Sequence, residues 1–176
     1  MKSTHVLLSR ILLILLPLIS HTSYSVEAED IAPVVELPLL EDGIAGRTNS
    51  IANHKGKLIY LDFWASWCGP CRQSFPFLQK IRTQYANQGF EVIAVNVDAK
   101  LSDALRFLKK FPIDYPILLD SAYTMAQIYE VQGLPTAYLI DTEGKVIYKH
   151  LGFKEADKKW ITALIEQNLP ALKKQP

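Results

Sequence analysis

Two nearly continuous apolar runs, residues 57–65 and 90–97, stand out in the hydrophobic pattern of the chain. Both are rich in β-branched and aromatic side chains, which is typical of strands buried on both faces. Between the two runs, apolar side chains recur mostly every three or four residues and predict an amphipathic helix over residues 72–87, ended by Gly89. The order strand, helix, strand predicts a parallel pair with a right-handed crossover.

Weaker patterns extend the domain on both sides of this unit. Residues 31–40 look extended, and the turn signal Glu41-Asp42-Gly43 predicts a hairpin that caps a sheet edge. Later segments predict helices over residues 102–110, 122–130 and 155–169, and strands over residues 117–119, 137–141 and 146–148. The chain has no internal repeat or linker, so we expect one α/β domain with a mixed sheet over residues 30–176.

The N-terminus has the order of a secretory signal. Lys2 and Arg10 precede the apolar run 11–19, and small residues follow. Residues 1–25 are therefore expected to be a signal peptide, with cleavage after Ser25 or after Ala28. An uncleaved membrane anchor is the alternative, although the run is shorter than the ~20 residues of a normal span. Either outcome predicts an extracytoplasmic, for example periplasmic, protein.

Charge and histidine content narrow the ligand classes. Removing residues 1–25 takes away two of the 19 basic residues and none of the 18 acidic ones, which leaves a formal charge of −1. Such a balance gives no reason to expect nucleic-acid or lipid binding. Only His54 and His150 remain after this removal. We expect no metal site and no cofactor, and we expect a monomer.

The only two cysteines lie in Cys68-Gly69-Pro70-Cys71, where the first apolar run meets the predicted helix. A thiol at a helix start faces unpaired N–H groups and the positive end of the dipole, which favour the thiolate. Cys68 is thus the expected nucleophile and Cys71 the resolving thiol of a redox-active disulfide. A structural bridge would close too small a loop to stabilise the fold much, and a zinc site would need two further ligands.

Asp62 is an acid inside an apolar strand, six residues before Cys68. Burial without a partner is costly for a carboxylate and raises its pKa. Asp62 is therefore a candidate proton relay for Cys71. The alternative is a structural acid paired with a lysine or arginine.

Residues 62–71 resemble the active-site strand and loop of the thioredoxin superfamily, and Gly133-Leu134-Pro135-Thr136 resembles its opposing loop. The leader, the hairpin, and an extra strand and helix within residues 107–130 are similar to the TlpA/ResA-like extracytoplasmic branch. This resemblance implies a thioredoxin fold, with a mixed central sheet flanked by helices, an N-terminal β-hairpin and a βα insertion before a cis-proline loop.

The resemblance also implies roles for single residues. Pro135 would be cis, lie against Cys68 and keep metal ions from the thiols. The substrate surface would comprise Trp67, Gly69, Pro70, Leu134 and Thr136, with Leu134 offering its backbone to an extended substrate segment. Two positions depart from related patterns: Ala94 stands where thioredoxins carry a lysine beside the buried aspartate, and Thr136 stands where cytochrome c maturation members carry a glutamate.

These features predict an oxidoreductase that reduces disulfides of particular envelope proteins, with cytochrome c maturation as one candidate pathway. The Gly-Pro interior resembles that of reducing members. A membrane protein would supply electrons. The alternatives are a thiol peroxidase, or a copper or folding chaperone that uses the thiols as ligands.

Overall fold

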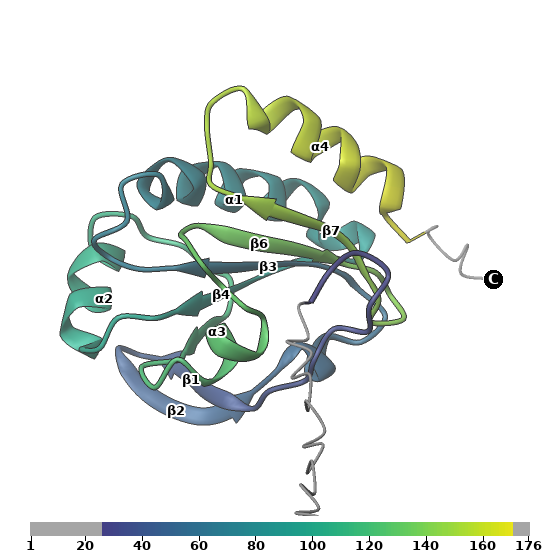
Figure 1. Cartoon of the computed structure of the whole chain (residues 1–176). Coiled ribbons are helices and arrows are strands. Elements are labelled where there is room, and N and C mark those ends of the chain that lie inside the picture. The colour runs from purple at the N-terminus through teal and green to yellow at the C-terminus, as the bar shows by residue number, and fades with distance from the viewer. Residues whose placement is uncertain (1–25, 171–176) are drawn as a thin grey trace, which may run out of the picture.

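A seven-stranded mixed sheet forms the centre of the computed structural model, which describes residues 26–170 (Figure 1). Its strands lie in the order β2-β1-β5-β4-β3-β6-β7. Neighbours β3 and β4 are parallel, as are β4 and β5, and the other pairs are antiparallel. The bounds are β1 Leu37–Glu41, β2 Ile44–Asn49, β3 Leu58–Trp64, β4 Phe90–Asn96, β5 Ile117–Leu119, β6 Thr136–Ile140 and β7 Val146–Leu151. The predicted mixed sheet is confirmed.

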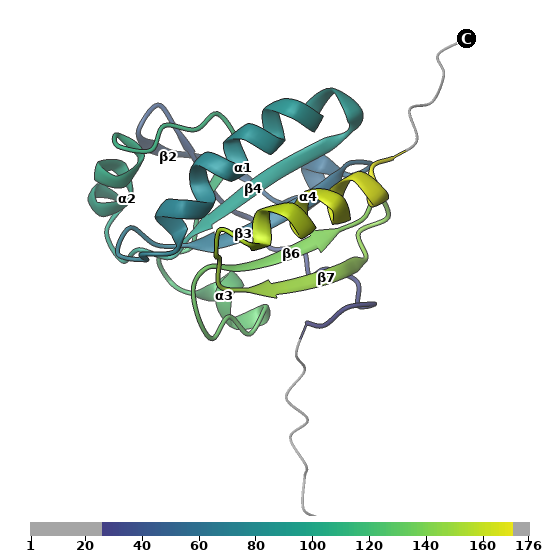
Figure 2. The ribbon, with the colours of Figure 1, turned by 90° about the horizontal axis from the view of Figure 1, so that it is seen from above.

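Helices cover both faces of the sheet. The α-helices are α1 Cys71–Tyr85, α2 Leu101–Leu108, α3 Thr124–Ile128 and α4 Asp157–Asn168, and 3-10 turns cover Ile51–His54 and Ala86–Gln88. Helices α1 and α4 lie side by side over one face, as the view from above shows (Figure 2). Helix α3 lies on the opposite face (Figure 1).

Burial explains the two apolar runs. Every residue of β3 and of β4 is buried. Successive side chains of a strand point to opposite faces, and accordingly Tyr60 and Trp64 join the core under α1, α2 and α4, whereas Leu61 and Phe63 join the core on the α3 side. By this alternation Asp62 points to the same side as Trp64, toward α1.

The N-terminal hairpin occupies the predicted edge position. Strands β1 and β2 are antiparallel, and Leu39 of β1 pairs with Leu118 of β5. The segment before the hairpin runs along the opposite edge of the sheet, beside β7, where Glu29 N–H donates to Val146 O at 2.7 Å. In the order of the chain, strand β5 and helix α3 come after α2 and before the Leu134–Pro135 loop, as expected for the insertion.

The prediction of a helix over residues 122–130 is wrong in extent, because α3 has only five residues. Tyr123 and Glu130 both have positive φ, at 58° and 48°, which interrupts helical geometry on each side. The buried Asp120 carboxylate accepts N–H groups from Thr124 at 2.7 Å and Ala126 at 2.8 Å. These bonds fix where the helix begins.

Within residues 26–170, no helix is long and apolar enough to cross a bilayer. The same residues hold no cluster of three or more potential metal ligands. The expected signal peptide, residues 1–25, lies outside the described residues.

Candidate active site

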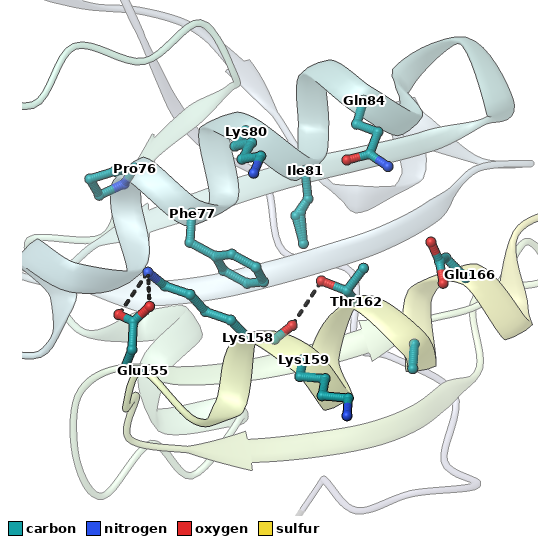
Figure 3. Close-up of a pocket in the computed structure, with 11 residues that line it drawn as sticks. Pro76, Phe77, Lys80, Ile81, Gln84, Glu155, Lys158, Lys159, Thr162 and Glu166 are labelled. Carbon is teal, nitrogen blue, oxygen red and sulfur yellow. Dashed lines mark hydrogen bonds and ion pairs between the residues drawn. The ribbon is translucent and has the colours of Figure 1, made fainter.

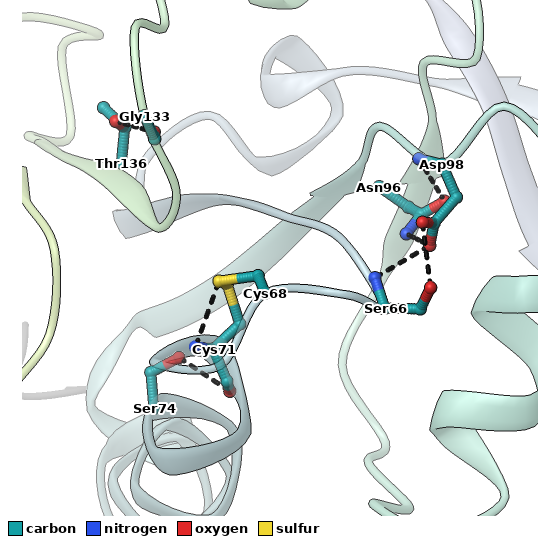
Figure 4. The surroundings of a disulfide bond; sticks show 8 residues. All are labelled: Ser66, Cys68, Cys71, Ser74, Asn96, Asp98, Gly133 and Thr136. Atoms are coloured by element: carbon teal, nitrogen blue, oxygen red, sulfur yellow. Dashed lines mark hydrogen bonds between the residues drawn. A yellow bond between two sulfur atoms is a disulfide. The ribbon is translucent and has the colours of Figure 1, made fainter.

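The two cysteines form a disulfide at the start of α1, with their Cα atoms 5.3 Å apart (Figure 4). Cys71 is the first residue of the helix, and its N–H donates to Cys68 Sγ at 3.2 Å. Cys68 keeps 4% of its surface exposed and Cys71 none. A thiolate at Cys68 would accept the same N–H, so the local geometry favours Cys68 as the attacking sulfur.

The loop between the cysteines presents little of its own bulk. Gly69 and Pro70 are exposed, and a Cβ added to Gly69 would meet no atom within 4 Å. Pro70 takes the N-cap position of α1 with φ −62°, where its missing N–H leaves no helical bond unmade. The space above Gly69 is open to an approaching chain.

The Leu134–Pro135 peptide bond is cis. Thr136 begins β6, pairs with Phe63 of β3, and donates its hydroxyl hydrogen to Gly133 O at 2.6 Å. Pro135 O accepts the Gly152 N–H at 2.7 Å, which ties the loop to the end of β7. Figure 4 places Gly133 and Thr136 across from the disulfide. The loop is therefore held at the same end of the sheet as the cysteines.

Asp62 is 1% exposed, and its Oδ2 has no hydrogen-bond partner among residues 26–170. Its Cα partners on the neighbouring strands are Ala94 and Ala137. No cation of the described residues forms an ion pair with it, and burial raises the pKa of its carboxyl well above the ordinary value. The paired structural acid that the sequence left open is not seen in this part of the chain.

Tyr115 is a neighbour of Asp62 that the sequence analysis missed. It is 4% exposed, and its hydroxyl lacks a hydrogen-bond partner among the described residues. Burial and then the charge of Asp62 raise the pKa of Tyr115 well above its usual range. The following Pro116 O accepts the Ala94 N–H at 2.9 Å, which brings this segment beside Asp62's partner. Tyr115 lies in a Pro-punctuated segment without periodicity, so no sequence signal marked it.

The two tryptophans near the motif have different environments. Trp67 is 66% exposed directly before Cys68, whereas Trp64 is fully buried. The Trp64 ring lies 4.7 Å from that of Phe75 and 4.8 Å from that of Phe107. Trp64 therefore supports the motif from the core, and Trp67 lies on the surface around Cys68.

Known proteins resemble this chain in sequence. The Redoxin family profile matches residues 27–165. The thiol-disulfide oxidoreductase ResA of Bacillus subtilis is 34% identical over 142 residues, which cover 78% of this chain and 79% of ResA. ResA of Geobacillus thermodenitrificans is also 34% identical, over 77% of this chain and 80% of its own length.

Solved structures of thiol-disulfide exchange proteins have a similar fold. A crystal structure assigned to the thiol:disulfide interchange protein DsbE of Chlorobium tepidum is 40% identical, has a TM-score of 0.77, and matches 83% of this chain and 100% of that one. The thioredoxin domain of a Bacteroides vulgatus thiol-disulfide oxidoreductase is 26% identical with a TM-score of 0.71, over 83% of this chain and 100% of that one. These likenesses confirm the predicted thioredoxin-like fold.

Proposed function

The chain belongs to the Redoxin family and is a thiol-disulfide oxidoreductase with a Cys68–Cys71 pair, and from this premise we propose that it reduces disulfides of particular proteins outside the cytoplasm. The observation that carries the proposal is the difference in exposure between the two cysteines at the start of α1, 4% for Cys68 and none for Cys71. Cys68 is reachable and Cys71 is shielded behind it. A protein disulfide is bulky, so it can react only with the cysteine that keeps some accessible surface.

The reaction has two exchange steps. The Cys68 thiolate attacks one sulfur of the substrate disulfide, which forms a mixed disulfide and releases the other substrate sulfur as a thiolate that takes up a proton. Cys71 then attacks Cys68 Sγ, which releases the second substrate thiol and leaves the Cys68–Cys71 disulfide. Two electrons pass from the dithiol to the substrate. A membrane protein that carries electrons from the cytoplasm would return the pair to the dithiol.

Asp62 would move the proton in the second step. The Cys71 thiol must lose its proton to attack, and a neighbouring carboxylate with a raised pKa can accept it near neutral pH. Asp62 points to the α1 side of the sheet, its Oδ2 has no hydrogen-bond partner among the described residues, and burial raises its pKa. Its acceptor oxygen is therefore unoccupied by any described group.

The cis-proline loop and the motif would hold the substrate chain. Trp67, Gly69 and Pro70 are exposed around Cys68. Leu134 and Thr136 flank Pro135, and Thr136 lies across from the disulfide (Figure 4). An extended substrate segment could pair with the Leu134 backbone there, as strands add to an open edge.

The direction of electron flow rests on how weakly the Cys68 thiolate is stabilised. Cys68 Sγ accepts one hydrogen bond from the described residues, from Cys71 N–H. No histidine or lysine side chain of these residues donates to it. A less stabilised thiolate makes the dithiol a stronger electron donor.

Equilibration with glutathione at fixed ratios tests the direction. We expect a reduction potential near or below the about −270 mV of thioredoxin. A potential near the about −120 mV of DsbA would overturn the reductase proposal. Turnover of peroxide without a protein disulfide, or tight Cu(I) binding by the thiols, would instead support the peroxidase or chaperone alternative.

Export is supported by the order of residues 1–19, and the contacts of residues 26–30 favour cleavage after Ser25. Val26 is fully buried, and Asp30 Oδ2 accepts the Glu27 N–H at 2.9 Å. Cleavage after Ala28 would remove both the buried Val26 side chain and the Glu27 N–H that bonds to Asp30. The intact mass of the protein from an envelope fraction should correspond to residues 26–176. Full-length protein that stays in carbonate-washed membranes would contradict cleavage.

A further inference from the structure

A groove of about 720 Å³ lies directly beside the redox motif. On one side it is bounded by Ser66 and Arg72, which flank the two cysteines in sequence. On the other side it is bounded by residues 103–111, from α2 and the turn that follows. We call it the basic groove. Its position makes it reachable by a chain whose disulfide is held at Cys68.

The charges of the basic groove are uneven. Four cations line it, namely Arg72, Arg106, Lys109 and Lys110, against the single acid Asp103. Arg106 pairs with Asp103, whereas the other three cations form no ion pair with the described residues. Arg72, Lys109 and Lys110 are exposed. Unneutralised cations in one groove attract an anionic ligand.

Aromatic rings form the floor of the groove and fix it to the core beneath the motif. Phe107 and Phe111 have ring centroids 4.7 Å apart, and Phe107 lies 4.8 Å from Trp64. Phe107 also packs edge-on against Phe75 of α1, at 4.9 Å. Helix α2 is thus held against the strand and the helix that carry the cysteines.

The Ser66 side of the groove is equally well held. The N–H and the hydroxyl of Ser66 both donate to Asp98, each at 2.9 Å, and Asn96 Nδ2 donates to the same carboxylate at 2.8 Å (Figure 4). Asp98 is 4% exposed and lies behind Ser66. Asp98 itself does not line the groove, and Arg72, Lys109 and Lys110 outnumber its single negative charge.

A second cavity serves as a contrast. It has about 860 Å³ and lies between α1 and α4 (Figure 3). Its lining mixes lysines with the acids Glu155 and Glu166, and Lys158 pairs with Glu155 at 2.8 Å. Neither cysteine, nor any residue adjacent to one, lines it. This cavity therefore lacks both the charge excess and the position of the basic groove.

We infer that the basic groove binds an acidic segment of the substrate protein next to the disulfide that Cys68 attacks. The inference rests on the proposed function and deepens it by naming a substrate class: protein disulfides flanked by aspartate or glutamate. The apolar floor would receive the aliphatic parts of that segment, while Arg72, Lys109 and Lys110 would pair with its carboxylates. The cis-proline loop and the groove would then hold the substrate on two sides of Cys68.

Three disulfide peptides test the inference, with the same core sequence and flanks that are acidic, neutral or basic. The measured quantity is kcat/KM for their reduction by the dithiol form, and its ratio between the acidic and the neutral peptide. We expect wild type to favour the acidic peptide about 5- to 10-fold at low salt, since several exposed pairs each contribute modestly. High salt should shrink this ratio.

The variant Lys109→Gln/Lys110→Gln should bring the ratio close to one. Because the ratio is taken within one protein sample, a smaller folded fraction does not change it. The matched control is Lys80→Gln/Lys159→Gln, which removes the same charge from the cavity between α1 and α4. This control should keep the wild-type ratio. An equal fall of the ratio in both variants would show that the preference depends only on the net charge of the protein, and it would overturn the inference.

Two further outcomes separate the possibilities. If all three peptides are reduced equally by wild type, the basic groove is not a substrate site although the reductase proposal stands. If none is reduced, both fall. Oxidised glutathione is the second source of carboxylates beside a disulfide: if its reduction alone depends on Lys109 and Lys110, the groove selects a small thiol and the protein-segment assignment is wrong.

Discussion

Asp62 of β3 and Ala94 of β4 are direct partners in the parallel strand pair, so a methyl group stands beside the buried carboxyl. Thioredoxins carry a lysine at the matching position. Without a cation there, burial alone sets the direction of the carboxyl's pKa, which rises. This relationship governs both the stability and the chemistry expected of Asp62.

Asp62→Asn should stabilise the oxidised protein at neutral pH. An unfolded aspartate loses its proton near pH 3.9, whereas the buried carboxyl keeps its proton to a higher pH. Between those two pKa values the folded state binds more protons, so wild-type stability falls as pH rises. Urea unfolding should show the asparagine variant more stable by over about 1 kcal/mol at pH 7. The difference should vanish below about pH 3, and a less stable variant at pH 7 would contradict the raised pKa.

The same substitution should slow the second exchange step. Loss of a positioned general base typically costs about 100-fold or more. The deficit should shrink toward the alkaline end of the profile, because hydroxide can then take the Cys71 proton in place of the carboxylate. Stopped-flow decay of the mixed disulfide between pH 6 and 10 measures this. Equal rates at every pH would remove Asp62 from the proton path.

Tyr115→Phe should move the pH profile of that step to higher pH. Tyr115 carries a buried hydroxyl near Asp62 with no hydrogen-bond partner among the described residues. This hydroxyl can donate a hydrogen bond to the carboxylate once Asp62 has lost its proton. Removing the donor makes the ionised form of Asp62 less favourable. The control is Tyr129→Phe, because that hydroxyl donates to Pro33 O within the core on the opposite face of the sheet. A profile that shifts equally in both variants would point to a general loss of packing.

Cys71→Ser should accumulate mixed disulfides on Cys68. Cys68, which keeps some accessible surface, still attacks, and the resolving thiol is gone. Non-reducing gels of envelope proteins should show adducts that reductant removes. Cys68→Ser should trap far fewer, since Cys71 has no exposed surface. Similar yields from the two variants would contradict the assigned roles.

Arg82→Ala should destabilise the fold through Glu91. Glu91 is 4% exposed, and although burial opposes its ionisation, bonds from Arg82 at 2.9 Å and Lys57 at 3.2 Å lower its pKa overall. Because Lys57 still pairs with Glu91 in this variant, we expect a loss of about 1.5 to 3 kcal/mol, the usual worth of a hydrogen bond to a charged group. The control Arg47→Ala breaks an exposed pair with Glu41 and should cost under about 1 kcal/mol. Chemical unfolding at pH 7 compares them.

This network also predicts an acid response. A carboxylate with a lowered pKa adds stability above its unfolded pKa, about 4.3, and loses it as pH falls through the folded value. The difference between wild type and Glu91→Gln should therefore narrow as pH is lowered from 6 to 3. A constant difference would show that charge is not the cause.

The central strands and the motif could be predicted because their signals are local. Burial on both faces produced the unbroken apolar runs of β3 and β4, and the position of Cys68 followed from the strand and helix around it. Helix α3 was overestimated, because backbone turns at Tyr123 and Glu130 leave no mark in hydrophobic periodicity. Hydrophobic periodicity indicates which side chains are buried, whereas such turns depend on backbone φ values.

The surroundings of the site were harder to predict. Tyr115, which feels the charge of Asp62, comes from a segment outside the parallel unit. The basic groove joins Arg72 to lysines more than 30 residues away in sequence. Both depend on how α2 and the following turn pack against the motif. Only the three-dimensional arrangement brings these residues together.

The N-terminal segment, residues 26–32, is attached to the edge of the sheet formed by β7. Ala32 N–H donates to Gly144 O at 2.8 Å, at the β6–β7 turn. Because Ile140 pairs with Ile59 and Thr136 with Phe63, this turn lies at the opposite end of β3 from the disulfide, roughly 20 Å away by the length of the strand. From Ala32 toward Val26 the segment runs back along β7, where Lys149 pairs with Glu27 at 2.8 Å, so a tether or affinity tag joined ahead of Val26 would hold the domain by its β7 edge.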